Sequence, residues 1–301
     1  LLYYYHEKYQ PYQFDFSSSG EIISNLPVIQ LVHHPFFSLK YTHYFALGIK
    51  PFQIHKILLR LILTFFLRLI LKISKKNLKK NYTIGNSIWS KQRYKNTYGI
   101  EANDFLYCTF NLDEYRDEMF SVYEKRFNDF VIIGRVSKDK RIEEAINVFE
   151  CVVKQNKNLD CRLHIIGQGE KNYVTFLKRK YQNEKIIFHG FINEIKKNQI
   201  LRQSKYGLHL FRYEHFGIAP CEMQNSGMIC FVYEKGGPSE IISPESLKFK
   251  SKKDLIKKIN LVIGNLENRK FNQKTIKNQT KKFTRRSFYE KLENIFLQFK
   301  V

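Results

Sequence analysis

The feature that most constrains this fold is a regular alternation of short apolar runs and longer amphipathic segments beginning at Phe130. The runs read "FVIIGRV", "CRLHIIG", "KIIFHGF", "YGLHLF" and "MICFVY". Short strands buried on both faces, each followed by a helix-length segment, are typical of successive βαβ units. This half of the chain is therefore predicted to be a doubly wound α/β domain with a parallel sheet.

Helices are expected after these strands. Pro at a first-turn position and Gly just past the last turn mark the shortest of them, from Pro220 to Ser226, with Gly227 at its end. The expected helices cover residues 141–154, 171–182, 194–203 and 220–226.

The first half repeats the pattern less completely. Its apolar runs "LLYYY", "LPVIQLVHH" and "NYTIGNS" surround a long helical stretch and predict about three strands. That is about half of a Rossmann-type sheet, so the remaining strands are expected before Leu1. We predict two Rossmann-like doubly wound domains at residues 1–120 and 121–301, the first one incomplete, with the charged segment 113–129 as a hinge candidate.

Net charge indicates which classes of partner the chain attracts, and cysteine content indicates its redox compartment. Lys and Arg number 51 against 28 Asp and Glu, a formal net charge of +23, so the surface is expected to attract nucleic acid, anionic lipid or phosphorylated ligands. The five cysteines form no CxxC pair, which favours reduced thiols in the cytoplasm and no structural zinc. The opening "LLYYYH" lacks the features of a secretory signal.

The stretch "HKILLRLILTFFLRLILKISKK" at 55–76 is mostly apolar, and five of its cations recur at multiples of four and form a stripe along one side of a helix. Internal arginines cost several kcal/mol at a bilayer centre, so a membrane span is disfavoured. Two alternatives stay open. The helix packs on the sheet, or it also rests on an anionic membrane interface. The cations are Lys56, Arg60, Arg68, Lys72 and Lys76.

The segment "EHFGIAPCE" places Glu214 and Glu222 around a tight turn after the strand "YGLHLF". Open α/β sheets bind ligands at this carboxyl end of their strands. Gly217 permits close approach of the backbone, and the free N–H groups of the following helix favour a phosphate. The alternatives are a helix-capping role for Glu222 and a solvated loop position for Glu214.

Two further segments carry candidate site residues. In "GRVSKDK", Arg135 and Lys140 leave the end of a strand and suit a diphosphate, although paired loop cations are more often solvated surface. In "PVIQLVHHP", His33 and His34 end an apolar strand, where histidines are more often hydrogen-bonded rim residues than catalytic ones.

Taken in order, these motifs resemble the retaining glycosyltransferases with two Rossmann-like domains, the GT-B type related to glycosyltransferase family 4, which carry an E-x7-E signature. The resemblance extends from "GRVSKDKRIEEAINVFE" to "FTRRSFYEKLENIFLQF". It covers residues 128–301 strongly and 1–115 weakly. The form "EHFGI" followed by "GGP" is most similar to mannosyltransferases that act on lipid-linked oligosaccharides.

The resemblance assigns roles around the nucleotide. Arg135 and Lys140 match the pair that neutralises the donor diphosphate, where negative charge grows as the leaving group departs. Glu222 matches the carboxylate that accepts hydrogen bonds from the donor ribose. Ile192, after "FHG", matches a main-chain contact to the nucleobase.

Other positions match those around the donor sugar. Glu214 corresponds to the acid at the sugar, and Phe216, Gly217 and Ile218 supply backbone amides facing sugar and phosphate. His33 falls where the family has a histidine reaching the donor sugar, with the adjacent His34 as the alternative.

The implied reaction is metal-independent sugar transfer with retention, by front-face attack in which the leaving phosphate helps deprotonate the acceptor. GDP-mannose is the favoured donor and a UDP-sugar is possible. The implied acceptor is a glycan or a lipid-linked saccharide, and the implied location is the cytoplasmic face of an anionic membrane. Residues 1–120 would form the acceptor-side domain, and the final helix of the donor-binding domain would pack back toward it.

The sequence departs from the family pattern in places. A first strand and a glycine-rich loop are expected before Leu1, and Met223 and Met228 stand where relatives often have Ala and Pro. The missing first strands favour one alternative, a non-catalytic relative that binds nucleotide sugars or glycans, whereas the four intact charged candidate residues of the site oppose it. The high charge prompts another, a nucleic-acid-binding protein, but no recognisable RNA or DNA motif supports it.

Overall fold

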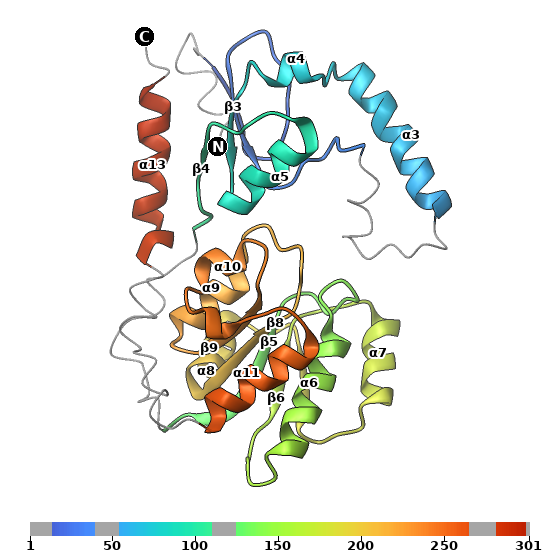
Figure 1. The fold of residues 1–301 in the computed structure, drawn as a ribbon, viewed down its shortest axis with the longest axis vertical. Coiled ribbons are helices and arrows are strands. Elements are labelled where there is room, and N and C mark those ends of the chain that lie inside the picture. Colours follow the sequence, from blue (N-terminus) through green and yellow to red (C-terminus); the bar gives the residue numbers. More distant parts are fainter. Residues whose placement is uncertain (1–13, 40–53, 110–124, 265–280, 299–301) are drawn as a thin grey trace. The chain divides into compact units, whose positions relative to one another are not determined.

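The computed structural model describes residues 14–39, 54–109, 125–264 and 281–298 (Figure 1). The chain divides into two compact units, one formed by Leu1–Cys108 with Arg285–Val301 and the other by Thr109–Thr284. The boundary thus falls before the expected one at residue 120, and the last helix belongs to the first unit. The expected strand "LLYYY" and most of the hinge candidate at 113–129 lie outside the described residues.

The first unit contains a parallel sheet. Its strands, in spatial order, are β1 (Asp15–Ser17), β2 (Val28–Val32), β3 (Tyr82–Gly85) and β4 (Asp104–Phe105). The two longer strands lie in predicted apolar runs. The sequence did not reveal β1 and β4, because strands of three and two residues are too short to show a hydrophobic period.

Helices of the first unit come from both ends of the chain. The last helix packs on the sheet, because its Ile295 belongs to the same buried cluster as Ile29 and Ile84. The helices are α3 (Ile54–Ile70), α4 (Lys75–Leu78), α5 (Ile88–Tyr98) and α13 (Arg285–Leu297).

Helix α3 is mostly exposed. The predicted helical stretch breaks near Lys72, which has a φ of 53°. Of the described side chains of α3, only Ile57 and Thr64 are buried. This differs from the expectation of a helix packed on the sheet, because ten large apolar side chains face solvent in the described structure. They are Leu58, Leu59, Ile62, Leu63, Phe65, Phe66, Leu67, Leu69, Ile70 and Leu71.

None of the helices in the described ranges combines the length and the apolar character that crossing a membrane requires.

The second unit contains a six-stranded parallel sheet (Figure 1). The order β10-β9-β8-β5-β6-β7 reverses direction between β5 and β8, as in a doubly wound Rossmann sheet. The strands are β5 (Phe127–Ile133), β6 (Leu163–Ile166), β7 (Ile186–Gly190), β8 (Ser204–His209), β9 (Ile229–Tyr233) and β10 (Lys248–Phe249).

Four helices of this unit lie close to the predicted ranges. They are α6 (Ile142–Gln155), α7 (Lys171–Lys180), α8 (Glu194–Gln203) and α9 (Ile218–Asn225). The structure adds two helices that were not predicted, α10 (Pro238–Ile241) and α11 (Lys252–Gly264), and short 3₁₀ turns at Glu245–Leu247 and Lys281–Phe283.

Helix α9 corrects one expectation. It begins two residues before Pro220, because Gly217 adopts a φ of 108° and serves as the N-cap. Pro220 is then the third helical residue, where a backbone N–H would still lack an intrahelical partner.

Aromatic packing anchors the centre of the second sheet. The ring of Phe130 on β5 lies 5.6 Å from Phe149 on α6 and 4.8 Å from Tyr206 on β8. Burial of rings this large contributes several kcal/mol to the core. The rigid sheet fixes the loops that leave its carboxyl edge. All five cysteines lie in the described ranges, and all are free thiols.

Candidate functional site

The reversal of strand order between β5 and β8 marks the carboxyl edge of the second sheet as the ligand side. Neighbouring strands end there in glycines with positive φ, Gly134 after β5 and Gly167 after β6. A Cβ on Gly167 would lie 2.0 Å from the Gly134 carbonyl oxygen, so the two loops pack backbone to backbone. A Cβ on Gly134 would meet no described atom within 4 Å, which leaves space beside this loop.

The structure joins Lys140 directly to Glu214. Lys140 Nζ lies 2.6 Å from Glu214 Oε2, and both side chains are largely buried. Lys140 Nζ also lies 4.2 Å from the centre of the Phe211 ring. Loops after β5 and β8 therefore bring together one predicted diphosphate ligand and the predicted sugar ligand.

A buried histidine lies beside this pair. His209 ends β8, and its Nε2 lies 3.5 Å from Glu214 Oε2, at the limit of a hydrogen bond. Burial lowers the pKa of His209, so its imidazole is neutral at pH 7. Burial acts to raise the pKa of Glu214, but His209 and Lys140 outweigh it and hold that pKa at about 2. Glu214 is therefore a carboxylate at neutral pH.

The "GGP" segment supports the turn that carries Glu214. The Gly237 N–H donates to the Glu214 carbonyl at 2.9 Å. A Cβ on Gly237 would lie only 2.2 Å from the His215 carbonyl oxygen. Glycine is required here by contact between two backbones.

Glu222 does not cap its helix. In the described helix α9 it is the fifth residue, the first turn holds no acid, and Gly217 forms no side-chain capping bond. The predicted helix range 220–226 put Glu222 in the first turn, and both that placement and the capping alternative are therefore wrong. Glu222 Oε1 instead lies 2.7 Å from Lys197 Nζ on α8. Glu222 is thus held from a neighbouring helix.

Arg135 lies apart from the Lys140–Glu214 pair. Its Nη2 is 3.3 Å from Asp139, and its side chain is 69% exposed. Among the contacts found in the described residues, none joins Arg135 to Lys140 or Glu214. A shared grip of both cations on a diphosphate stays a prediction.

The remaining donor-side positions lie on the same edge of the sheet. Phe216 is buried, with its ring 5.4 Å from Phe283. Ile218 opens α9 and is 49% exposed. Ile192 lies two residues past the end of β7, directly before Asn193, the N-cap of α8. Their backbone contacts to a donor stay predictions.

His33 and His34 lie in the first unit. Both ring nitrogens of His33 have partners, with Nδ1 2.9 Å from Asn86 Nδ2 and Nε2 3.2 Å from the Ser18 carbonyl oxygen. Burial, together with nearby Arg93 and Arg60, lowers the pKa of His34 to about 4. His33 is thus a hydrogen-bonded rim histidine, and its contact with a donor sugar stays a prediction.

Sequence reasoning missed Lys197 and His209. His209 is a polar residue inside the apolar run "YGLHLF", five residues before Glu214, and that position was a usable signal. Lys197 is one of 51 basic residues, and nothing in its spacing separates it from a solvated lysine.

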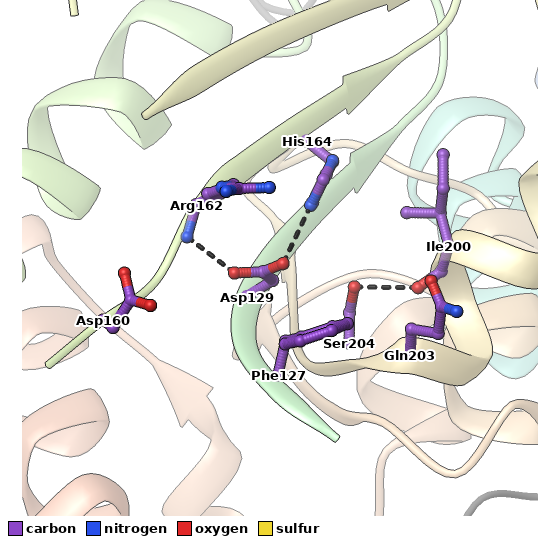
Figure 2. Close-up of a pocket in the computed structure, with 8 residues that line it drawn as sticks. All are labelled: Phe127, Asp129, Asp160, Arg162, His164, Ile200, Gln203 and Ser204. Atoms are coloured by element: carbon purple, nitrogen blue, oxygen red, sulfur yellow. Dashed lines mark hydrogen bonds and ion pairs between the residues drawn. The ribbon is translucent and has the colours of Figure 1, made fainter. Parts of the chain in front are cut away.

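A hollow of about 170 Å³ lies at the opposite, amino edge of the second sheet (Figure 2). Within it, the Asp129 carboxylate accepts from the Arg162 N–H at 2.7 Å and lies 3.1 Å from His164 Nε2. His164 Nδ1 is in turn 2.9 Å from His189 Nε2. The lining residues are Phe127, Asp129, Asp160, Arg162, His164, Ile200, Gln203 and Ser204.

This hollow contains none of the predicted donor ligands, so we place the candidate donor site at the carboxyl edge. In the part of the chain that the structure describes, no three His, Cys, Asp or Glu side chains gather as a metal site requires. Metal independence stays a prediction.

Sequence comparison places the second unit in a known family. The family model "Glycosyl transferases group 1" matches residues 116–282. The chain is 24% identical over 236 residues to the GDP-Man:Man(3)GlcNAc(2)-PP-Dol alpha-1,2-mannosyltransferase of Candida glabrata, covering 74% of this chain and 46% of the relative. It is 28% identical over 153 residues to Alpha-1,3/1,6-mannosyltransferase ALG2 of Saccharomyces cerevisiae, covering 48% and 30%. The match thus spans less than half of each relative.

Solved structures share the fold. Sucrose-phosphate synthase from Thermosynechococcus elongatus matches with a TM-score of 0.70 and 15% identity, covering 99% of this chain and 76% of that one. Anabaena HepE in complex with UDP and glucose matches with a TM-score of 0.65 and 15% identity, covering 90% and 71%. Together with the two parallel sheets, these matches confirm the predicted α/β fold of the GT-B type.

Proposed function

The chain belongs to the group 1 glycosyltransferase family, and on that premise we propose that it moves a hexose, with mannose favoured, from a nucleotide sugar to a glycan or lipid-linked acceptor. One observation carries the proposal. Lys140, expected at the donor diphosphate, and Glu214, expected at the donor sugar, meet at 2.6 Å where the strand order reverses.

Charge at this position suits departure of a nucleoside diphosphate. Lys140 supplies a fixed cation where negative charge grows on the leaving group. The first amides of α9, at Ile218 and Ala219, lie at the positive end of the helix and favour the same anion. Because Lys140 also contacts Glu214, one cation would lie beside both the donor diphosphate and the carboxylate that binds the donor sugar.

Retention of the anomeric configuration follows if the acceptor attacks from the face that the diphosphate leaves. The leaving phosphate oxygen then takes the acceptor proton, and no covalent bond to the protein forms. Glu214, ionised at neutral pH, accepts hydrogen bonds from the sugar hydroxyls and fixes the sugar for this attack. The anomer of the product, read by NMR, tests retention directly.

The favoured donor is GDP-mannose. Both curated relatives described above are named as mannosyltransferases, and one name includes GDP-Man and a dolichol-linked acceptor. A UDP-sugar is the second candidate, because the Anabaena neighbour was crystallised with UDP and glucose. Sites for a GDP-sugar and for a UDP-sugar need the same contacts to the diphosphate and the ribose.

A direct assay separates enzyme from binder. The purified chain is incubated with labelled GDP-mannose or UDP-glucose and a lipid-linked oligosaccharide acceptor. We expect transfer, or slow donor hydrolysis, from one donor, and loss of both in Glu214→Gln. Donor binding without either reaction would instead support the non-catalytic alternative.

We also propose that α3 holds the protein on the cytoplasmic face of an anionic membrane. The helix exposes large apolar side chains beside Arg60 and Arg68, and its first turn contains no acid in the described structure. Apolar burial and attraction to anionic headgroups then act on the same helix. A lipid-linked acceptor would lie at the same surface.

Vesicle sedimentation tests this placement. Replacement of Arg60, Arg68 and Lys72 by Gln should reduce binding to vesicles containing phosphatidylserine, because each lost cation near the surface costs about 1 kcal/mol. Replacing Lys154, Lys157 and Lys257, three exposed lysines of the second unit, is the matched control. Equal losses in both variants would contradict a specific role for α3.

A further inference from the structure

Lys197 is a buried cation shared by two carboxylates. Its side chain is 10% exposed, and its Nζ lies 2.7 Å from Glu222 Oε1 and 2.7 Å from Glu194 Oε2. Glu222 is 16% exposed, whereas Glu194 is 63% exposed. Ion pairs at the surface are screened by water, so the contact with Glu222 is the stronger restraint.

The charge state of this lysine is fixed by its partners. Burial alone would lower the pKa of Lys197, but the hydrogen bonds to Glu194 and Glu222 outweigh burial and raise it. Lys197 therefore remains protonated at neutral pH and holds one oxygen of Glu222. A carboxylate offers about four acceptor positions, so this contact is compatible with further bonds to ribose hydroxyls.

The same lysine lies five residues after Ile192, the residue expected to contact the nucleobase. Ile192 precedes Asn193, whose Oδ1 accepts from the Lys196 N–H at 2.9 Å and starts α8. Lys197 is the fourth residue of that helix. One rigid helix thus connects the expected base contact to the expected ribose contact.

We propose that Lys197 is a positioning residue for the nucleoside part of the donor, acting through Glu222. It fixes the plane of the Glu222 carboxylate against α8 and offsets the repulsion between that carboxylate and an incoming diphosphate. This inference rests on the proposed function, because it assumes that a nucleotide sugar binds at the carboxyl edge of the second sheet.

Binding of nucleoside diphosphates with and without ribose hydroxyls tests the proposal. GDP and UDP are titrated into the purified chain by calorimetry, and the tighter one is compared with its 2′,3′-dideoxy analogue. For Lys197→Met we expect about tenfold weaker binding of the ribonucleotide. We expect less than a twofold change for the dideoxy analogue, which cannot bond to Glu222 through those hydroxyls.

Matched variants separate this role from simple stability. Lys197→Arg keeps the cation and should recover most of the affinity. Glu194→Gln removes the other partner of Lys197 and should change affinity less than twofold. In a Glu222→Gln background, adding Lys197→Met should have little further effect, because the coupling between the two residues is already lost. This double variant also leaves no unpaired buried carboxylate, should Lys197→Met alone fail to fold.

The outcomes are distinct. Equal losses for ribonucleotide and dideoxy analogue, or no loss at all, would overturn the positioning role while leaving the proposed function intact. If the unaltered chain binds neither GDP nor UDP, the proposed function fails, and this inference fails with it.

Discussion

Glu214 and Glu222 lie at the two ends of one short segment, yet the structure holds them in different ways. Glu214 lies beside Lys140, from the loop after β5, and buried His209, the last residue of β8, where the strand order reverses. Glu222 is held by Lys197 from the neighbouring helix α8. Lys140 is also expected to contact the diphosphate, so the contacts of the Glu214 carboxylate are predicted to change when the donor binds. The Glu222 carboxylate is already held by Lys197 before the donor binds.

The two identical residues have different cationic partners, and under the proposed function we expect them to serve different steps. An acid whose cation is shared with the leaving group is suited to the reacting sugar. An acid held by a cation that is not expected to contact the leaving group is suited to binding, because its geometry need not change between donor and product. The predictions below test this division.

The largest expected effect is on catalysis at Glu214. Glu214→Gln should lower the rate constant of transfer by about 10²- to 10³-fold, because it removes the charge that positions the sugar. Donor affinity should fall less than tenfold. Initial rates over a range of donor concentrations separate the two, with the exposed residue Glu184→Gln as control. A change in affinity alone would assign Glu214 to binding and break the comparison.

Acid sensitivity should also centre on Glu214. Its pKa in the folded chain, about 2, lies below the ordinary value of 4.5, so the folded state favours the carboxylate. The resulting stability is present above about pH 4.5 and is lost as the pH falls toward 2, on the order of 3 kcal/mol. Urea denaturation across this range should show that the free energy of unfolding of Glu214→Gln falls less steeply with decreasing pH than that of the unaltered chain, whereas Glu184→Gln should match the unaltered chain.

At the other end of the segment, Glu222→Ala should weaken donor binding by about 1.5 to 3 kcal/mol, because it removes a hydrogen-bonded charge. That corresponds to a change in Kd of roughly 10- to 150-fold, measurable by calorimetry. The rate constant at saturating donor should change far less. Unchanged affinity would leave Glu222 as a structural partner of Lys197.

The smallest effect is expected from the glycine that supports the Glu214 turn. Gly237→Ala places a methyl group against the His215 carbonyl and should lower the free energy of unfolding by about 1 to 3 kcal/mol. Thermal melting measures it. Gly264→Ala is the matched control, since a Cβ at that position would meet no described atom within 4 Å. Equal melting temperatures for both variants would show that the turn accommodates the methyl group without loss of stability.

The sequence revealed those strands whose side chains are nearly all buried in the core. The runs that became β5 to β9 are mostly apolar because the central strands of the sheet are buried on both faces, and that pattern can be read without knowing which strands are neighbours. Strands β1 and β4 exist only through pairing with β2 and β3, and so left no pattern. The start of α9 was predicted at Pro220, but the helix begins two residues earlier, at Ile218, because Gly217 has a positive φ and serves as the N-cap.

What the sequence determined by itself was the α/β class, the carboxyl-edge position of "EHFGIAPCE" and the identity of most candidate ligands, since periodicity and local motifs encode these. Only the tertiary structure decided which charges meet. Glu214 pairs with Lys140 across 74 residues of chain, and Glu222 with Lys197 across 25. Such pairs depend on strand order, which brings distant loops together, and on burial, which makes a single contact strong enough to fix a charge.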